Sequence, residues 1–321
     1  RFGLTGRSPR HLTNQISFDI FFFPLQHRMA MNIVTDGVLE PLDIQIGNFP
    51  ILFSAPHGIS VKRDGDCDHK AELHTTRLAQ SWAVTVDGSS VAWAKCHHGK
   101  KGALEGNRDP NYLTAEELRE NSWNRALQQH AMKFKGGGAH VDVHGKRDPE
   151  HGSAGDCDVG LMPLEVFGDS AAVQDLRREL QRTLRPLLEE RGFRLDLEPA
   201  LHGYWGKTRW SMSMQGASLG LQSVQLELSK RLRTALVEDK AFSDEMAFAL
   251  MHALLRSVHG SRLAELDEAI NPDLSSVHCA NSNLKWKNSE PWEGTCANPA
   301  CGQELSAGQL KTTEDAEKEK P

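Results

Sequence analysis

The sequence contains no long hydrophobic run and no excess of basic residues, and each absence excludes a class of function. The longest apolar run near its start, residues 20–23, is far shorter than the about 20 residues that a membrane-spanning helix needs. Lysine and arginine total 37 against 43 acidic residues, and no basic patch is interleaved with aromatic residues. We therefore expect a soluble, cytoplasmic protein with no membrane span and no nucleic-acid partner.

Cysteine is scarce and scattered, which excludes the disulfide framework of a small secreted domain. The chain has 6 cysteines in 321 residues. Near the C-terminus, His278, Cys279, Cys296 and Cys301 leave open a second, structural zinc. Against this, the spacing between Cys296 and Cys301 is wider than in the usual zinc knuckle.

Composition divides the chain into four expected parts. Residues 1–28 carry four arginines against a single acid, Asp19, so they are either an organelle transit peptide or a leader upstream of a later start. In the first case the protein belongs in an organelle rather than the cytoplasm. Residues 29–265 are long enough for one large domain, and residues 266–306 form an extension that contains cysteine. Residues 307–321 are charged and poor in apolar residues, so we expect them to be disordered.

Residues 139–145, Ala-His-Val-Asp-Val-His-Gly, are predicted to form a short buried strand that ends at a glycine. Side chains alternate along a strand, so Asp142 and His144 share one face while the valines between and before them take the other. Open α/β sheets place their chemistry at such strand ends. The alternative is an ordinary core strand with a hydrogen-bonded histidine.

Two further segments have the same character. Residues 51–58 form an apolar strand that stops at a turn carrying His57, and residues 224–229 form a strand in which leucines flank Glu227. A carboxylate between leucines is costly to bury unless it has a partner or a cation nearby. Three polar groups at strand ends, each in an apolar setting, indicate one shared metal site.

Four motifs come in the order found in the N-formylglutamate amidohydrolases, and the chain resembles that family. They are residues 54–58 (SAPHG), 107–111 (NRDPN), 142–145 (DVHG) and 225–229 (QLELS). The resemblance covers about residues 45 to 260 and extends to the wider group of zinc carboxypeptidases and aspartoacylases. It implies an α/β fold with a mixed twisted sheet flanked by helices, zinc carboxypeptidase-like (phosphorylase/hydrolase-like). It also implies a single zinc and attack of water on an amide carbonyl.

The resemblance implies His57 and His144 as two zinc ligands, but it does not assign the third directly. Zinc carboxypeptidases take their second ligand three residues after the first histidine, where this chain has Ser60. The formylglutamate-like proteins have an acid-x-His segment opening the next helix instead, and Glu72 fits that pattern. We expect His57, Glu72 and His144 to bind zinc and to leave a fourth position for water, whose pKa the ion would lower towards ~7. Competitors for the third position are Asp64, Asp66, Asp68, His69 and His74.

Glu227 is the expected general base, which takes the proton of the water and passes it to the leaving amine. Asp142 shares a face with His144, but we expect it to lie too far down the strand to be the partner of that histidine.

Three polar side chains are expected to act on the substrate. The guanidinium of Arg108 is expected to grip a substrate carboxylate or to polarise the scissile carbonyl; the alternative is a salt bridge to Asp109 or Glu105. Asn111 in the same motif is expected to bind substrate. So is Arg209, in a loop dense in glycine, aromatic and basic residues.

Elsewhere the pattern predicts ordinary elements of an α/β domain. A capping box formed by Thr114 and Glu117 should open a helix. Strands are expected at 91–94 and 156–161, and helices at 71–84, 114–134, 169–192 and 243–258.

Together these features predict a metal-dependent amidohydrolase that cleaves a C–N amide bond in an N-acyl (N-formyl-like) amino acid or short peptide. One alternative is a metallo-carboxypeptidase of the same fold. Others are a non-catalytic zinc-binding descendant, or a binding module formed by the C-terminal cysteines with the enzyme attached. The sequence does not predict the oligomeric state.

Overall fold

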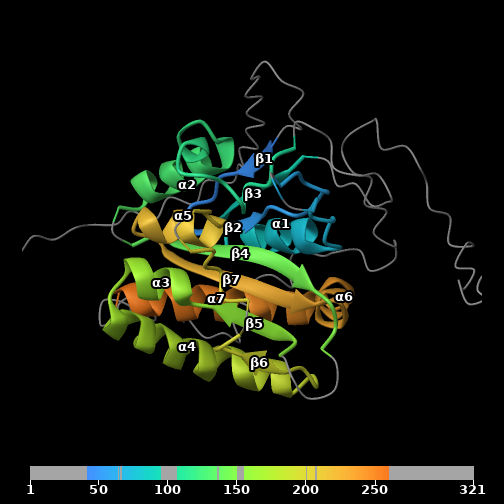
Figure 1. The fold of residues 1–321 in the computed structure, drawn as a ribbon. Coiled ribbons are helices and arrows are strands. Elements are labelled where there is room, and N and C mark those ends of the chain that lie inside the picture. The colour runs from blue at the N-terminus through green and yellow to red at the C-terminus, as the bar shows by residue number, and fades with distance from the viewer. Residues whose placement is uncertain are drawn as a thin grey trace, which may run out of the picture. The chain divides into compact units, whose positions relative to one another are not determined.

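A mixed sheet of seven strands runs through the part of the chain that the computed structural model describes, which is residues 42–259 without 64, 66, 95–106, 136, 150–154, 200 and 207. The strands lie in the order β1-β3-β2-β4-β7-β5-β6 (Figure 1). In chain order they are β1 Leu42–Gln45, β2 Ile51–Ala55, β3 Ser89–Trp93, β4 Ala139–Lys146, β5 Cys157–Gly160, β6 Leu195–Asp196 and β7 Gln222–Ser229. The central strands β3, β2, β4 and β7 are parallel, whereas β1 and β5 join the sheet antiparallel to β3 and β7. The predicted α/β class is confirmed.

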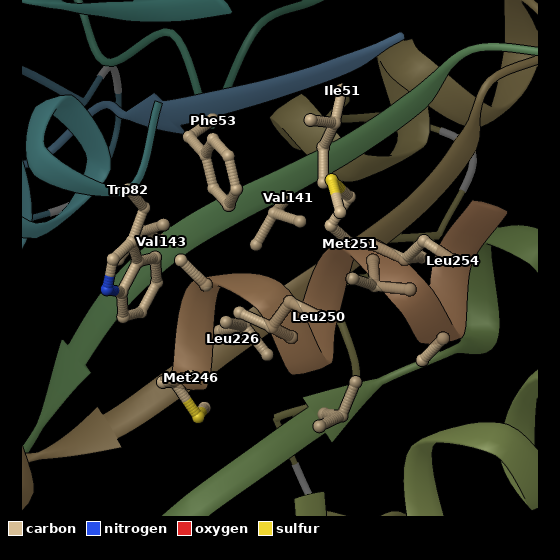
Figure 2. Close-up of a cluster of buried hydrophobic side chains, with 14 of the residues drawn as sticks. Ile51, Phe53, Trp82, Val141, Val143, Leu226, Met246, Leu250, Met251 and Leu254 are labelled. Carbon is tan, nitrogen blue, oxygen red and sulfur yellow. The ribbon is translucent and has the colours of Figure 1, made fainter. Parts of the chain in front are cut away.

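Helices flank the sheet and bury two separate apolar clusters. The helices are α1 Thr75–Thr85, α2 Ser122–Lys133, α3 Met162–Phe167, α4 Ser170–Glu189, α5 Met212–Ser218, α6 Lys230–Glu238 and α7 Lys240–His259, with a 3-10 turn η1 at Glu117–Arg119. The larger cluster joins side chains of α1, α4, α6 and α7 to the strands, and Figure 2 shows its centre. The smaller cluster contains side chains of α2 and α5. None of the helices in this described part is long and apolar enough to cross a membrane.

The two faces of the central strands differ in chemistry, as their alternating pattern predicts. On β4, Val141 and Val143 pack into the larger cluster. The residues between them, His140, Asp142 and His144, point to the opposite face and are also buried. In the same way β7 sends Val224, Leu226 and Leu228 into the cluster and turns Ser223, Gln225 and Glu227 the other way. Adjacent parallel strands therefore place a layer of buried polar side chains on the sheet face opposite the larger apolar cluster.

The helix predicted at residues 71–84 begins four residues late. His74 has a backbone φ of 73°, in the left-handed region that a right-handed helix excludes, and α1 starts at Thr75. Glu72 therefore lies in the irregular segment before the helix, where its backbone N–H donates to His57 O at 2.8 Å.

The prediction of a single helix at residues 114–134 is also wrong, although the predicted capping box is confirmed. Thr114 and Glu117 bond reciprocally: Thr114 N donates to Glu117 Oε2 at 2.7 Å, and Glu117 N donates to Thr114 Oγ1 at 3.3 Å. This start continues only as η1. Asn121 then takes an extended conformation, and its side chain accepts from Trp123 N at 2.9 Å to cap α2.

The remaining elements agree with the sequence patterns. Strands β3 and β5 lie at the expected positions, and α4 and α7 correspond to the helices predicted at 169–192 and 243–258. The segments 1–28, 266–306 and 307–321, with the cysteines proposed for a second zinc, lie outside the described residues.

Two buried histidines should make the stability of the fold depend on pH. Burial lowers the pKa of His130 on α2 and of His140 on β4 from 6.5 to about 4. Between these values the unfolded chain binds more protons than the folded chain. The contribution of the two neutral histidines to the unfolding free energy is therefore complete above pH 6.5 and is lost as the pH falls towards 4.

We expect the unfolding free energy of the wild-type protein to fall more steeply on acidification than that of His130→Gln, which lacks one of these groups. Between about pH 7.5 and 4.5 the difference should be on the order of 2 kcal/mol. Urea unfolding of both proteins across this range is the measurement. Parallel pH profiles would show that His130 titrates normally in the folded state.

Candidate metal centre

His57, Glu72 and His144 meet at the carboxyl ends of β2 and β4. His57 follows β2 in a turn whose Pro56 carbonyl accepts from Trp93 Nε1 at 2.7 Å. His144 lies near the end of β4. Glu72 comes from the segment before α1 and is fixed at both ends, since its carbonyl accepts from Thr75 Oγ1 at 3.1 Å and its N–H binds the carbonyl of His57.

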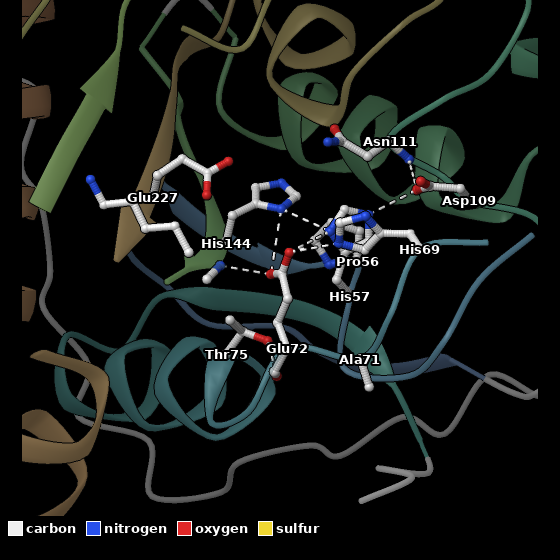
Figure 3. A network of polar contacts seen from close by, with 12 residues as sticks. Pro56, His57, His69, Ala71, Glu72, Thr75, Asp109, Asn111, His144 and Glu227 are labelled. Carbon is white, nitrogen blue, oxygen red and sulfur yellow. Dashed lines mark hydrogen bonds and ion pairs between the residues drawn. The ribbon is translucent and has the colours of Figure 1, made fainter. Parts of the chain in front are cut away.

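The three side chains turn their polar atoms towards one point (Figure 3). His57 Nδ1 lies 3.0 Å from Glu72 Oε1 and 3.0 Å from His144 Nδ1, and His144 Nδ1 lies 3.6 Å from Glu72 Oε2. Both histidines are 1% exposed, so bulk water does not screen these groups. Within the described residues, this is the group of histidine, cysteine and acidic side chains that lies close enough together to hold a metal ion.

Each histidine has a carboxylate behind it. His57 Nε2 lies 3.0 Å from Asp109 Oδ1, and His144 Nε2 lies 2.9 Å from Asp142 Oδ2. The expectation that Asp142 lies too far away is therefore wrong: a side chain on a strand leans along it, so an imidazole reaches a carboxylate two residues back on the same face. With Nε2 engaged in both rings, Nδ1 is left to face the centre.

A buried chain of hydrogen bonds runs from Asp142 along one face of the sheet and joins side chains of β2, β4 and β7. Ser54 Oγ donates to Asp142 Oδ1 at 2.8 Å, so the 2.9 Å contact between Ser54 Oγ and His140 Nε2 requires His140 Nε2 to be the donor. His140 Nδ1 must then accept from Ser223 Oγ at 2.7 Å, because burial lowers the pKa of His140 to about 4 and keeps the ring neutral. One arrangement of protons satisfies the whole chain, which fixes the orientation of Asp142.

The electrostatics of the centre favour positive charge. Burial disfavours the charged form of His57, but Asp109 and Glu72 outweigh it and raise its pKa to about 9. The pKa of His144 is raised as well, against burial, by Asp142 and Glu72. Burial also opposes the charged form of Glu72, whose pKa is nevertheless lowered, chiefly by His57. A dication between the Nδ1 atoms would supply the charge that protons supply here, and its binding would release them.

The donor set fits a four-coordinate divalent ion. Bonds of about 2.0–2.1 Å at tetrahedral angles place neighbouring donor atoms roughly 3.3 Å apart. The two Nδ1 atoms lie 3.0 Å apart, and His57 Nδ1 lies 3.0 Å from Glu72 Oε1, so both separations are close to this value. Two imidazoles and one carboxylate form one of the three-ligand sets that leave the fourth position open for chemistry.

Glu227 lies beside this group without belonging to it. It is the register partner of His144 on the neighbouring strand and occupies the same face of the sheet (Figure 3). Its side chain accepts from Gln225 Nε2 at 2.7 Å. The residue is 8% exposed, and burial raises its pKa to about 7 despite the opposing effect of His144.

Among the competing ligands that the structure describes, His69 contacts two residues of the centre. Its Nε2 is 2.8 Å from Glu72 Oε1, and its ring is 3.8 Å from the ring of His57, yet it does not belong to the metal-holding group. Asp68 pairs with Lys62 Nζ at 3.1 Å. The other acidic competitors, Asp64 and Asp66, lie outside the described residues.

The structure places Arg108 and its neighbour Asp109 differently from the expectation. Arg108 Nη2 contacts the carboxylate of Glu117. Of the two alternative partners that the sequence offered, Glu105 lies outside the described residues. Asp109 turns to the centre, where it contacts His57, and its Oδ2 accepts from Arg63 Nε at 2.5 Å. Neither Asp109 nor Arg63 was identified from the sequence, although Asp109 belongs to a motif that the sequence singled out.

Asn111 fastens the loop that carries Asp109. Its backbone N–H donates to Asp109 Oδ1 at 2.8 Å, and its Oδ1 accepts from Met212 N at 2.6 Å at the start of α5. The oxygen of Asn111 is thus engaged within the protein, so any direct substrate contact would use its amide nitrogen.

Arg209 lies with Arg63 against an aromatic pair. The Cζ atoms of Arg209 and Arg63 are 4.7 Å and 5.3 Å from the centre of the Tyr112 ring, and Tyr112 meets Trp205 edge to face at 5.6 Å. Through Arg63 and Asp109 this cluster connects to His57. Two guanidinium groups therefore lie together on the Asp109 side of the centre.

Glu72→Gln should weaken metal binding by at least ~10-fold, because it keeps the size of the side chain but removes the charge that offsets the ion; loss of even an outer partner costs this much. The matched control is Asp68→Asn, which removes a charge from the same loop but not from the centre. Metal titration of both variants tests the assignment, and the reverse ranking would make Asp68 the ligand.

No family model matches the chain, and no curated protein matches it. Similar solved structures include a bacteriophage poly-gamma-glutamate hydrolase, with 20% identity and a TM-score of 0.38 over 69% of this chain and 91% of that chain. An Agrobacterium tumefaciens gene product has 10% identity and a TM-score of 0.39 over 69% and 96% of the two chains. An N-acetylmuramoyl-L-alanine amidase from Clostridium difficile has 10% identity and a TM-score of 0.34 over 65% and 97%. Likeness at this level carries no argument about activity.

Proposed function

We propose that the protein is a zinc-dependent amidohydrolase that cleaves the C–N amide bond of an N-acyl (N-formyl-like) amino acid or short peptide. The observation that carries this proposal is the group of His57, Glu72 and His144, whose two histidines are buried, with a separate buried carboxylate, Glu227, beside it. Three metal-holding side chains and a proton acceptor outside that group are the parts that metal-assisted hydrolysis requires. The four motifs shared with the N-formylglutamate amidohydrolases support the substrate class.

In this proposal His57 and His144 would hold zinc through Nδ1, and Glu72 would hold it through a carboxylate oxygen. When bound there, zinc supplies Lewis acidity that polarises a carbonyl and makes water a stronger nucleophile near neutral pH. Asp109 and Asp142 keep the two imidazoles in the required orientation through Nε2. Such outer partners also raise the basicity of the ligand nitrogen.

Glu227 acts as the general base and then as the general acid. Its carboxylate stands on the same sheet face as His144, so it takes a proton from the attacking water and returns it to the leaving amine. Burial brings its pKa to about 7, where a carboxyl group can both accept and donate a proton at neutral pH. The hydrogen bond from Gln225 holds one carboxylate oxygen in place and leaves the other for this exchange.

The substrate-binding side chains are proposed to be Arg209 and Asn111. A carboxylate of the substrate would meet the guanidinium of Arg209, which stacks on Tyr112 and has no acidic partner in the described part of the chain. Arg108 keeps its catalytic role in this proposal only if it exchanges Glu117 for an anionic group of the substrate.

A substrate panel tests the reaction class. The zinc-loaded protein should release the free amino acid from N-formylglutamate and related N-acyl amino acids. A metallo-carboxypeptidase would instead remove C-terminal residues from unblocked peptides. Zinc binding without turnover on either set would leave a non-catalytic zinc protein and contradict the proposal.

Glu227→Gln should lower turnover at least ~100-fold, because a positioned proton acceptor is worth about two to four powers of ten in rate. Zinc content should not change, since all three ligands remain. The control is Asp158→Asn. Asp158 lies opposite Glu227 in the register of β5 and β7, so this change removes a neighbouring carboxylate, and turnover should stay within a few-fold. Loss of zinc together with activity in Glu227→Gln would make Glu227 a ligand, and loss of stability with normal activity would make it structural.

A further inference from the structure

Arg233 on α6 is buried directly behind the metal centre. It is 5% exposed, and its guanidinium donates to backbone carbonyls rather than to a carboxylate. Nε donates to Leu228 O at 3.1 Å, Nη2 donates to Lys146 O at 3.1 Å, and Nη1 donates to Leu73 O. One side chain thus ties together three segments that are far apart in the sequence.

Each of these carbonyls belongs to a residue one or two positions after a side chain of the proposed site. Leu73 follows Glu72, and Leu228 follows Glu227. Lys146 lies two residues after His144 on β4. His144 and the neighbouring Glu227 come from strands of the sheet, whereas Glu72 comes from an irregular segment outside any strand or helix. Arg233 is the side chain that fastens this irregular segment to the ends of both strands.

Gly145 makes the fit close. A Cβ atom on Gly145 would lie 2.4 Å from both Cζ and Nη1 of Arg233. The guanidinium therefore lies against the backbone of β4, and any side chain at position 145 would clash with it. The N–H of Gly145 in turn donates to Glu72 Oε2 at 2.7 Å. The same short stretch of β4 therefore contacts Arg233 on one side and the proposed ligand on the other.

We infer that Arg233 is a positioning residue for the metal centre: its three carbonyl contacts hold Glu72 at the distance from His57 and His144 that metal binding needs. The planar guanidinium suits this role because its N–H groups point in several fixed directions, whereas a lysine presents one compact ammonium group. This inference rests on the proposed zinc centre and adds a residue that touches neither zinc nor substrate.

Arg233→Lys, compared with Arg231→Lys, tests the inference. Arg231 is a matched control on the same helix. It also donates several hydrogen bonds, but these go to Asp156, at 2.6 and 2.5 Å, and to Gly192 O, at 3.4 Å, and none goes to a residue beside the centre. Zinc affinity would be measured by competition with a chelating dye, and the melting temperature of the metal-free proteins would be measured alongside. We expect Arg233→Lys to lower zinc affinity ~10–100-fold, the range found for outer partners of metal ligands, and Arg231→Lys to leave it within about twofold.

A merely structural role would lower the melting temperature of metal-free Arg233→Lys without changing the zinc affinity of the folded protein, and that result would overturn the inference. Equal losses of affinity in the two variants would overturn it too. Absence of zinc binding by the wild-type protein would instead remove the proposed function, and the inference with it.

A second pair of variants keeps the test decisive if Arg233→Lys does not fold. Gly145→Ala leaves Arg233 in the chain but pushes a methyl group into its guanidinium. Gly138→Ala is its control at the other end of β4, where the new Cβ would lie 2.7 Å from Leu221 Cδ2. Zinc affinity should fall in Gly145→Ala and not in Gly138→Ala. Unchanged affinity in Gly145→Ala would contradict the inference.

Discussion

The pairing of each central histidine with a buried carboxylate is the interaction on which the rest of the site depends. Asp109 and Asp142 occupy Nε2 of His57 and His144, so both rings present Nδ1 to the same point. Without these partners a buried imidazole could rotate, and either nitrogen could face the centre. The carboxylates also bring more negative charge than the site can hold unpaired, which favours a cation between the rings.

The fold provides this arrangement through the register of its parallel strands. Ser54, Asp142 and Gln225 lie side by side on β2, β4 and β7, and His144 lies beside Glu227. Because all of them share one sheet face, the opposite face is free to pack against α1 and α7. The apolar core thus fixes the strands, and the strands fix the spacing of the polar layer.

The parts of the site that follow from local pattern could be predicted from the sequence. Residues 139–145 and 224–229 alternate between apolar and polar positions, and residues 51–58 form an apolar run that ends at a turn. These patterns mark the three segments as strands, so His57, His144 and Glu227 could be placed at strand ends. Glu72 could be proposed only through the resemblance, since nothing in its own segment marks it as part of a site. The structure brings it to the two histidines.

Contacts that depend on tertiary structure could not be predicted. The role of Asp109 depends on a loop held by Asn111 and the start of α5, more than one hundred positions away. Arg233 has the sequence context of a solvated helix, and only the approach of three backbone carbonyls makes it part of the site. The late start of α1 follows from the left-handed conformation of His74, which no periodicity reveals.

The central claim is that zinc is held by two imidazoles and a carboxylate at the ends of β2 and β4. X-ray absorption at the zinc edge of the purified protein, compared with His144→Ala, tests it most directly. The account predicts nitrogen and oxygen neighbours at about 2.0–2.2 Å with scattering from two imidazoles, and the loss of this signal in His144→Ala. Sulfur neighbours at about 2.3 Å, or an unchanged spectrum in His144→Ala, would place the zinc elsewhere in the chain and contradict the account.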